Sequence, residues 1–398
     1  MTDGASATIA PFPANRPRPR AGLVLTGGGA RAAYQVGVVK AVRDVLGNPK
    51  KNPFPILCGT SAGAINATTL AVFADDFSRA VANLIEVWEN MHCRHIYRTD
   101  ALHILKSGAK WLAAMMLISR ENPISLLDNT PLAHMLDRTL PFDRIQANID
   151  SGALYAACIT ASGYTSGQSV SFFQGGSGLE GWERNQRVGA AVTLKVEYLL
   201  ASAALPFIFP AVKVHREYFG DGSMRQIAPV SPALHLGADR VLIVGTGRQT
   251  QDQNRARSNV YPSLAQIAGH ALNSIFHDSL AVDIERLERI NRTVRLIPPD
   301  RLSDSAVQLR PVKVLFISPS QPIERIAARF IHELPVTVRF LLKPTGALSR
   351  SGSNLASYLL FEESFCRALI DLGYQDTISR EAELREFFNP PEAAERHG

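Results

Sequence analysis

The feature that most constrains the fold is a short glycine-flanked serine motif, Gly59-Thr60-Ser61-Ala62-Gly63. An apolar run, Ile56-Leu57-Cys58, precedes it, and a helix-like segment, Ala64-Ile65-Asn66-Ala67, follows it. A sharp strand-to-helix turn projects its central side chain out of a sheet, and only glycine-sized neighbours leave room for the backbone to bend. The pattern predicts a nucleophile elbow, with Ser61 as the candidate nucleophile and Gly59 and Gly63 as the residues that make room for it.

The serine motif alone is a weak signal. With Gly at about 7% of residues, such a pattern arises by chance in roughly one chain in ten of this length. A glycine-serine loop with Ser61 as the N-cap of a helix is the plainer interpretation of the same residues.

A glycine-rich loop upstream adds support. The run Leu23-Val24-Leu25 predicts a buried strand, Gly27-Gly28-Gly29 follows it, and a helical pattern continues to Leu46 before a stop at Gly47. Three glycines expose backbone N–H groups. Together with the positive end of the following helix, these groups can stabilise the oxyanion that forms when a nucleophile attacks an ester.

The glycine loop has other interpretations. Gly27-x-Gly29-x-x-Ala32 between a strand and a helix fits the dinucleotide-binding fingerprint of a Rossmann-type oxidoreductase. That fingerprint requires an acidic residue at the end of the next strand, where this chain has Cys58 and the serine motif. A phosphate-binding P-loop lacks its Gly-Lys-Ser/Thr ending here, and a tight strand-to-helix turn without chemistry also fits.

The third element is a carboxylate between glycines, Gly220-Asp221-Gly222-Ser223, which follows the strand-like run Val212 to His215. An Asp-Gly pair taken alone is more often a turn than a catalytic base. Here it completes an ordered set that consists of a glycine loop, a serine elbow and a glycine-flanked aspartate.

This set resembles the patatin-like phospholipases, serine acyl hydrolases that use a Ser-Asp dyad without histidine. Gly27-Gly28-Gly29-Ala30-Arg31 is similar to the family's oxyanion loop, the serine motif to its nucleophile motif, and Asp221-Gly222-Ser223 to its aspartate motif. The resemblance is firm over residues 21–247. Two flanking stretches also look like bacterial members: Ser125-Leu126-Leu127-Asp128-Asn129-Thr130-Pro131-Leu132 and Ala201-Ser202-Ala203-Ala204-Leu205-Pro206-Phe207-Ile208-Phe209-Pro210.

The resemblance implies a three-layer α/β/α fold with a mainly parallel central sheet. Residues 21–247 would form the catalytic domain, and residues 248–398 a mostly helical extension packed on it. The implied activity is hydrolysis of carboxylic esters in acyl lipids, of the phospholipase A or lysophospholipase type, with no metal or cofactor. A catalytically weak lipid-binding or regulatory protein that keeps the same site is the second hypothesis.

The implied mechanism gives each motif a role. Ser61 attacks the acyl carbonyl, Asp221 takes its proton, and the amides of Gly27, Gly28 and Gly29 stabilise the oxyanion, with Arg31 as an additional donor. Arg31 fits a purely structural role equally well. The chain departs from the family pattern at Ala32, where glycine is usual, and at Thr26, where an acidic residue is common.

A conventional Ser-Asp-His triad is the competing mechanism, because several histidines follow the aspartate in the required order. None of them lies in a glycine-marked loop, and Ser61 closes only the second strand-like segment of the chain. The candidates are His235, His270, His277, His332 and His397.

Bulk composition is that of a globular enzyme, since 46% of the 398 residues are hydrophobic and 20% are charged. The proline-rich residues 1–20 predict an unstructured arm, and their longest apolar stretch is too short for a secretory signal. Four scattered cysteines, Cys58, Cys93, Cys158 and Cys366, have no metal or redox spacing, which favours a cytoplasmic protein.

The net charge of +6 favours anionic partners. For a lipid hydrolase the expected partner is an acidic membrane surface, and Asp100 to Ile118 is the candidate contact helix, although a core or lid helix explains the same pattern. No basic run, zinc spacing or nucleic-acid motif points to nucleic acid. Residues 294–297 predict a strand, and residues 264–290 a long amphipathic helix.

Overall fold

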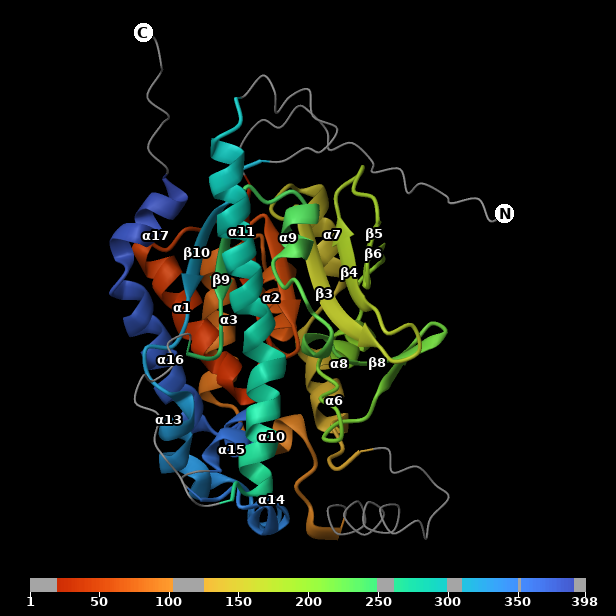
Figure 1. Ribbon diagram of the computed structural model, residues 1–398, viewed down its shortest axis with the longest axis vertical. Coiled ribbons are helices and arrows are strands. Elements are labelled where there is room, and N and C mark those ends of the chain that lie inside the picture. Colours follow the sequence, from red (N-terminus) through yellow and green to blue (C-terminus); the bar gives the residue numbers. More distant parts are fainter. Residues whose placement is uncertain (1–19, 103–124, 249–260, 299–309, 350–351, 390–398) are drawn as a thin grey trace.

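The computed structural model describes residues 20–102, 125–248, 261–298, 310–349 and 352–389 (Figure 1). Most of the proline-rich arm and residues 103–118 of the candidate membrane helix therefore lie outside the described residues. Within the described residues, no helix combines the length and the apolar character that crossing a bilayer requires.

A ten-stranded sheet forms the centre of the molecule, in the order β10-β9-β1-β2-β3-β4-β6-β5, with β8 paired to β3 and β7 to β8. Its first five strands, from β10 to β3, run parallel. The bounds of the strands are β1 Ala21–Leu25, β2 Ile56–Thr60, β3 Ala156–Gly163, β4 Ser169–Gly175, β5 Trp182–Arg184, β6 Arg187–Ala191, β7 Val212–Val214, β8 Glu217–Asp221, β9 Arg240–Val244 and β10 Lys313–Ile317.

The central parallel strands are short apolar runs because both of their faces are covered. On one face, Leu23 and Leu57 belong to the main core with α1 (Ala33–Val45), α2 (Ala62–Val72) and α3 (Phe77–Glu89). On the other face, Val24 and Cys58 pack with α9 (Ser231–His235) and α11 (Ser279–Arg295). The predicted three-layer α/β/α arrangement with a mainly parallel sheet is confirmed.

The C-terminal region is joined closely to the rest of the fold. Its strand β10 pairs with β9, and its helix α16 (Glu363–Ile378) packs lengthwise on α1. This contact needs glycine on both helices, because a Cβ atom on Gly37 would overlap the carbonyl of Ile370 and one on Gly373 would overlap that of Tyr34. The region is mostly helical, as predicted, and the division of the chain at residue 247 stays a prediction.

The predicted long helix is present as α10 (Leu264–Asn273), a π-helical turn (Ser274–Asp278) and α11, which follow one another without a break. The predicted strand at residues 294–297 is wrong, because Val294 belongs to the last turn of α11. Arg292 and Arg295 lie in the same turn, where positive side chains interact favourably with the negative end of the helix dipole.

The remaining helices cover the sheet and surround the site. Their bounds are α4 Cys93–Ile96, α6 Thr130–Thr139, α7 Asp143–Asp150, α8 Val196–Ser202, α13 Ile323–Phe330, α14 Val336–Leu342, α15 Ser353–Leu359 and α17 Glu381–Phe388, with short 3-10 turns at Gly29–Ala32, Gly222–Met224, Ile331–Glu333 and Lys343–Thr345.

Candidate active site

Ser61 lies at the sharp turn between β2 and α2, in a strained backbone conformation with φ 55° and ψ −132°. Positive φ is uncommon for a residue with a side chain and persists where the surrounding structure enforces it. A contact with a distant segment holds the turn: the N–H of Ser61 donates a 2.8 Å hydrogen bond to Ser202 Oγ, which in turn donates to the carbonyl of Thr160.

The surroundings of the two glycines in the serine motif leave no room for a side chain. A Cβ atom on Gly59 would overlap the backbone of Gly63 and Ala64, and one on Gly63 would overlap the carbonyl oxygens of Leu25 and Thr26. The elbow therefore packs against the end of β1, and its tight fit depends on the absence of side chains.

Asp221 reaches the serine through the register of three strands. Thr60, the residue before Ser61, pairs with Thr160 on β3, and the next residue of β3, Ala161, pairs with Asp221 at the end of β8. Ser61 and Asp221, 160 positions apart in the chain, thus lie near each other where β2 and β8 end. Ser61 and Asp221 both line the same cavity.

The carboxyl of Asp221 is completely buried. Burial raises its pKa to about 6, and the hydroxyl of Ser61 and the N–H and hydroxyl of Ser223 oppose that rise. The N–H of Ser223 donates to Oδ1 at 2.9 Å, whereas Oδ2 has no hydrogen-bond partner among the described residues. The hydroxyl of Ser61 is thus close enough to affect the pKa without a hydrogen bond of ordinary geometry.

The glycine loop folds as the 3-10 turn Gly29–Ala32 between β1 and α1. Gly29 lines the same cavity as Ser61, with φ 55°. Cβ atoms on Gly28 and Gly29 would overlap the side chain of Thr246 and the carbonyl of Tyr358, respectively. Among the described residues the N–H groups of Gly28 and Gly29 have no acceptor, so they are available to a ligand.

Arg31 lies in the same turn, but its guanidinium is bound by the C-terminal region. Its Nε donates to Ser357 Oγ at 2.8 Å and its Nη1 to Asn273 Oδ1 at 3.1 Å, while Nη2 contacts Asn354. The guanidinium also lies 4.0 Å from the centre of the Tyr358 ring. This arrangement favours a structural role for Arg31 over direct contact with an oxyanion.

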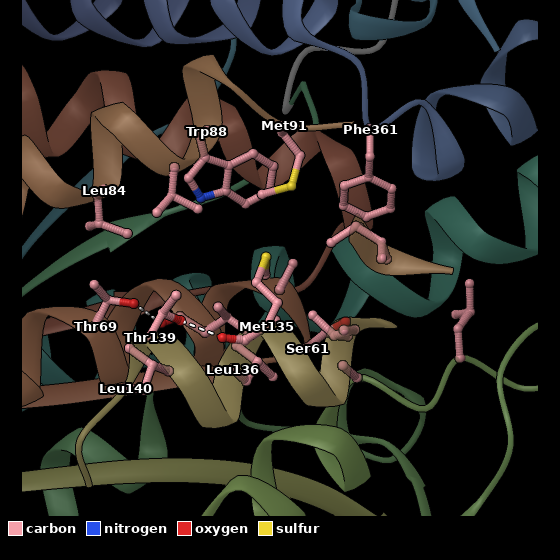
Figure 2. A pocket seen from close by; sticks show the side chains of 18 of the residues that line it. Ser61, Thr69, Leu84, Trp88, Met91, Met135, Leu136, Thr139, Leu140 and Phe361 are labelled. Carbon is pink, nitrogen blue, oxygen red and sulfur yellow. Dashed lines mark hydrogen bonds between the residues drawn. The ribbon is translucent and has the colours of Figure 1, made fainter. Parts of the chain in front are cut away.

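The cavity that begins at Ser61 has a volume of about 330 Å³ and mostly apolar walls. In Figure 2, Trp88, Met91 and Phe361 on one side face Met135 and Leu136 on the other, with Ser61 at one end. The hydroxyls of Thr69 and Thr139 donate to carbonyls of their own helices, so the wall offers few free polar groups. The volume is about twice that of an engineered apolar cavity of roughly 150 Å³ that binds benzene.

Much of the cavity wall comes from segments outside the stretches that the sequence motifs identified. Helices α3 and α6 provide one part, and residues outside the catalytic motifs, Phe276, Tyr358, Leu359 and Phe361, provide another. Helical periodicity marks these residues only as buried.

A buried chain of polar side chains was also missed by the sequence analysis. Gln35 donates to the carbonyl of Thr26, Asn66 donates to Gln35, and Trp88 donates to Asn66, with distances of 2.7, 3.0 and 2.8 Å. This series of hydrogen bonds links Thr26, at the start of the glycine loop, to Trp88 in the cavity wall. Polar residues on otherwise apolar helix faces were the signal for it.

The structure gives no support to a histidine in the site. No histidine of the described residues lines the cavity. His235 stacks on Trp182, and burial lowers its pKa to about 4; burial and then the charge of Arg31 lower that of His277 to about 3. His397 lies outside the described residues. In the described part of the chain, no three His, Cys, Asp or Glu side chains are grouped so as to hold a metal ion.

Comparison with known proteins gives two results. Residues 23–234 match the family model described as patatin-like phospholipase. A protein of Pseudomonas aeruginosa (strain BWHPSA011 / Pa011) named cGAMP-activated phospholipase is 28% identical over 213 residues, which are 54% of this chain and 55% of that protein. The chain thus spans about half the length of the curated relative that it matches. The region matched by the family model contains Ser61, Asp221 and the glycine loop.

Proposed function

Because this chain belongs to the patatin-like phospholipase family, we propose that it is a serine hydrolase of carboxylic esters in acyl lipids, of the phospholipase A or lysophospholipase type. The observation that carries the proposal is the shared cavity. A strained serine and a buried carboxyl lie at one end of an apolar space that suits an acyl chain.

In the proposed mechanism, Ser61 Oγ forms a bond to the acyl carbon while its proton passes to Asp221. The negative charge that develops on the carbonyl oxygen is stabilised by the N–H groups of Gly28 and Gly29, with Gly27 completing the loop. The alcohol leaves with the proton held by Asp221. Water then attacks the acyl carbon and gives a proton to Asp221. The bond to Ser61 Oγ breaks, Asp221 returns the proton to Oγ, and the fatty acid is released.

The burial of Asp221 is what makes a carboxylate a plausible base. An aspartate in water, with a pKa of about 3.9, is poorly matched to a serine hydroxyl. A pKa of about 6 brings Asp221 closer to a working pH near neutral, at which it is still mostly ionised. The unpaired Oδ2 leaves one face of the carboxylate open to the incoming proton. We assign Arg31 the role of holding the loop.

The decisive test is release of fatty acid from mixed phospholipids, compared between the wild type and Ser61→Ala by thin-layer analysis. We expect hydrolysis by the wild type and none above background by the variant. Ser379→Ala, at an exposed serine after α16, is the matched control and should behave as the wild type. Equal fatty-acid release by wild type and Ser61→Ala would reject the proposal and favour a lipid-binding regulator.

A fluorophosphonate probe tests the nucleophile without any choice of lipid. The probe should label Ser61, identified by peptide mapping, in the wild type and in Ser379→Ala. Labelling of another serine, with Ser61 unmodified, would contradict the proposed site. A nicotinamide fluorescence titration with no binding would remove the oxidoreductase alternative.

We also propose that an anionic small molecule regulates this enzyme. The name of the Pseudomonas relative states that it is activated by cGAMP. In this chain, a second hollow of about 840 Å³ is lined by Arg20, Lys51 and Arg240 and by no acidic residue. It lies at the amino ends of β1 and β9, whereas Ser61 follows the carboxyl end of β2.

The regulator is tested by phospholipid hydrolysis with and without added cGAMP. Stimulation that is weakened in Lys51→Glu and preserved in Lys50→Glu, at the neighbouring position outside the hollow, would support this site. Identical rates with and without the nucleotide would remove cGAMP as a regulator and leave the hydrolase proposal intact.

A further inference from the structure

Two helices of the C-terminal region carry large apolar side chains on their outer surfaces. On α14 these are Val336 and Phe340, one helical turn apart, and on α10 they are Leu264 and Ile267. Between 47% and 75% of each residue is exposed. We refer to these four residues as the α10–α14 face. Residues at spacings of three and four lie on one side of a helix, so each helix presents a coherent apolar stripe.

The start of α10 lies beside the turn that follows α14. Gly346, after the 3-10 turn that follows α14, lies so close to Ser263 that an added Cβ atom would be 3.0 Å from that of the serine. Ser263 is the N-cap of α10 and directly precedes Leu264. Figure 1 shows α10, α14 and α15 together at the lower end of the molecule. The two helices that carry the apolar stripes are therefore neighbours at this end of the molecule.

The same end of the molecule contains segments that line the cavity. Thr337 of α14 donates a 2.7 Å hydrogen bond to the carbonyl of Thr99, three residues after the cavity residue Ile96. The π-helical turn that continues α10 carries Phe276, another cavity residue. The α10–α14 face thus adjoins segments that line the candidate active site.

Phe207 adds an exposed aromatic side chain close to the cavity. It is 73% exposed and has a φ of 65°, which is unusual for an aromatic residue and strained by roughly 1–3 kcal/mol in general. Its neighbours Leu205 and Phe209 line the cavity, and Phe209 packs near Tyr97. Its carbonyl accepts a hydrogen bond from Leu126, which ties this loop to the segment before α6.

The charges of α14 and of the turn that follows it have one sign, and α10 carries no Asp, Glu, Lys or Arg. From Val336 to Thr345 the charged residues are Arg339 and Lys343, and α10 contains no acidic residue. Lys343 lies three residues after Phe340 and is exposed. The apolar stripe of α14 is thus accompanied by cations, which is the arrangement that binds a lipid surface with anionic headgroups.

We propose that the α10–α14 face docks the enzyme on an anionic lipid surface and so places the active-site cavity against its substrate. This inference rests on the proposed function, because only an acyl-lipid substrate gives the surface a reason to adjoin the cavity. A second copy of the chain is the alternative occupant, and it is an outcome of the test.

The experiment uses the full chain with Val336→Ser and Phe340→Ser combined. Sedimentation is measured with vesicles of phosphatidylcholine and phosphatidylserine in equal amounts, and with vesicles of phosphatidylcholine alone. We expect the wild type to favour the anionic vesicles, and the double variant to bind them at least about tenfold more weakly, as the loss of two partly inserted apolar side chains implies. Lys343→Glu should weaken binding to anionic vesicles and leave binding to neutral ones unchanged.

Leu296→Ser is the matched control. Leu296 is 84% exposed at the end of α11, and about 48 Å of continuous helix separates it from Leu264. This variant should bind vesicles as the wild type does. Equal binding by the wild type and the double variant would overturn the proposal. So would a wild-type dimer, seen by size-exclusion chromatography, that the double variant converts to a monomer.

A soluble short-chain ester separates failure of docking from failure of the proposed function. The double variant should keep wild-type turnover of the dissolved ester while losing turnover of vesicle phospholipid. If the wild type hydrolyses neither substrate, the proposed function fails, and vesicle binding still decides whether the face docks on lipid. Equal thermal unfolding of all variants checks that the fold is intact.

Discussion

Arg31 of the glycine loop and Asn273 at the end of α10 are joined by a hydrogen bond of 3.1 Å, although 242 residues separate them in the chain. Asn273 also accepts a hydrogen bond from the hydroxyl of Tyr358, whose ring lies beside the guanidinium. The loop that carries the candidate oxyanion donors is therefore held by helices from the other end of the protein.

Replacing Arg31 by Lys should lower both stability and turnover. A lysine ammonium cannot reach Ser357, Asn273 and Asn354 together, and each buried acceptor left unpaired costs about 1–3 kcal/mol. We expect kcat for a soluble ester to fall at least about tenfold, since small displacements of a catalytic loop are costly, with a smaller change in KM. Arg94→Lys, at an exposed position, is the control. Reduced stability with unchanged kcat would show that Arg31 does not position the loop.

Replacing Asp221 by Asn should abolish hydrolysis and stabilise the fold at neutral pH. The wild-type carboxyl has a pKa of about 6 when folded and 3.8 as the reference for the unfolded chain. Its contribution to stability is therefore fully present below about pH 4 and is lost as the pH rises through about 6. Above that pH the variant should be more stable by about 1–3 kcal/mol, allowing for an unpaired amide.

Chemical denaturation of wild type and Asp221→Asn at a series of pH values measures this difference. The advantage of the variant should grow between about pH 4 and pH 6 and then stay constant. A difference that does not change with pH would mean that the folded carboxyl titrates at its ordinary pKa.

The rate of hydrolysis should rise with pH through the pKa of Asp221. The carboxylate accepts the serine proton only when ionised, so kcat/KM for a soluble ester should increase up to about pH 6 and then level off. Stopped assays with a non-ionising substrate give the profile. A rate that falls over this range would assign the titration to a group that must be protonated.

Replacing Met135 by Trp should shorten the acyl chains that the enzyme accepts. Met135 faces Trp88 and Met91 across the cavity, where a larger ring would occupy part of the space (Figure 2). We expect kcat/KM for long-chain esters to fall at least about tenfold relative to short-chain esters, as loss of several buried methylene groups implies. His134→Trp, at an exposed position of the same helix, should keep the wild-type preference. An unchanged chain-length preference would place the acyl chain elsewhere.

Replacing Gly63 by Ala should damage the elbow even though alanine favours helices. Helix propensity alone predicts a gain of about 1 kcal/mol, but the added methyl would overlap the carbonyls of Leu25 and Thr26. We expect lower stability and at least a hundredfold loss of kcat, on the order that about 1 Å of misplacement produces. Gly176→Ala is the control, since its nearest neighbour would lie at 3.8 Å. A stable, active Gly63→Ala protein would show that the elbow tolerates the displacement.

The local parts of the site could be predicted from the sequence because short-range sterics determine them. A strand that ends in glycines around a serine can continue into a helix only through a tight turn, and the same reasoning identified the glycine loop after β1. The apolar run Leu23-Val24-Leu25 predicted the buried strand β1, and the family resemblance implied a mainly parallel sheet with helices on both faces. In residues 294–297 the same reasoning failed, since an apolar stretch at the end of a helix resembles a strand.

The convergence of these parts was decided only by tertiary structure. Ser61 and Asp221 line the same cavity because β8 pairs along one edge with the end of β3, and no local pattern encodes that register. Contacts between distant segments likewise bury Asp221 and so raise its pKa. They also form the hydrogen bond between Arg31 and Asn273 and bring Phe276 and Tyr358 into the cavity wall. The amino-acid sequence alone therefore determined which groups are available for chemistry. Long-range packing decided their environment, because desolvation and reactivity depend on everything that surrounds a side chain.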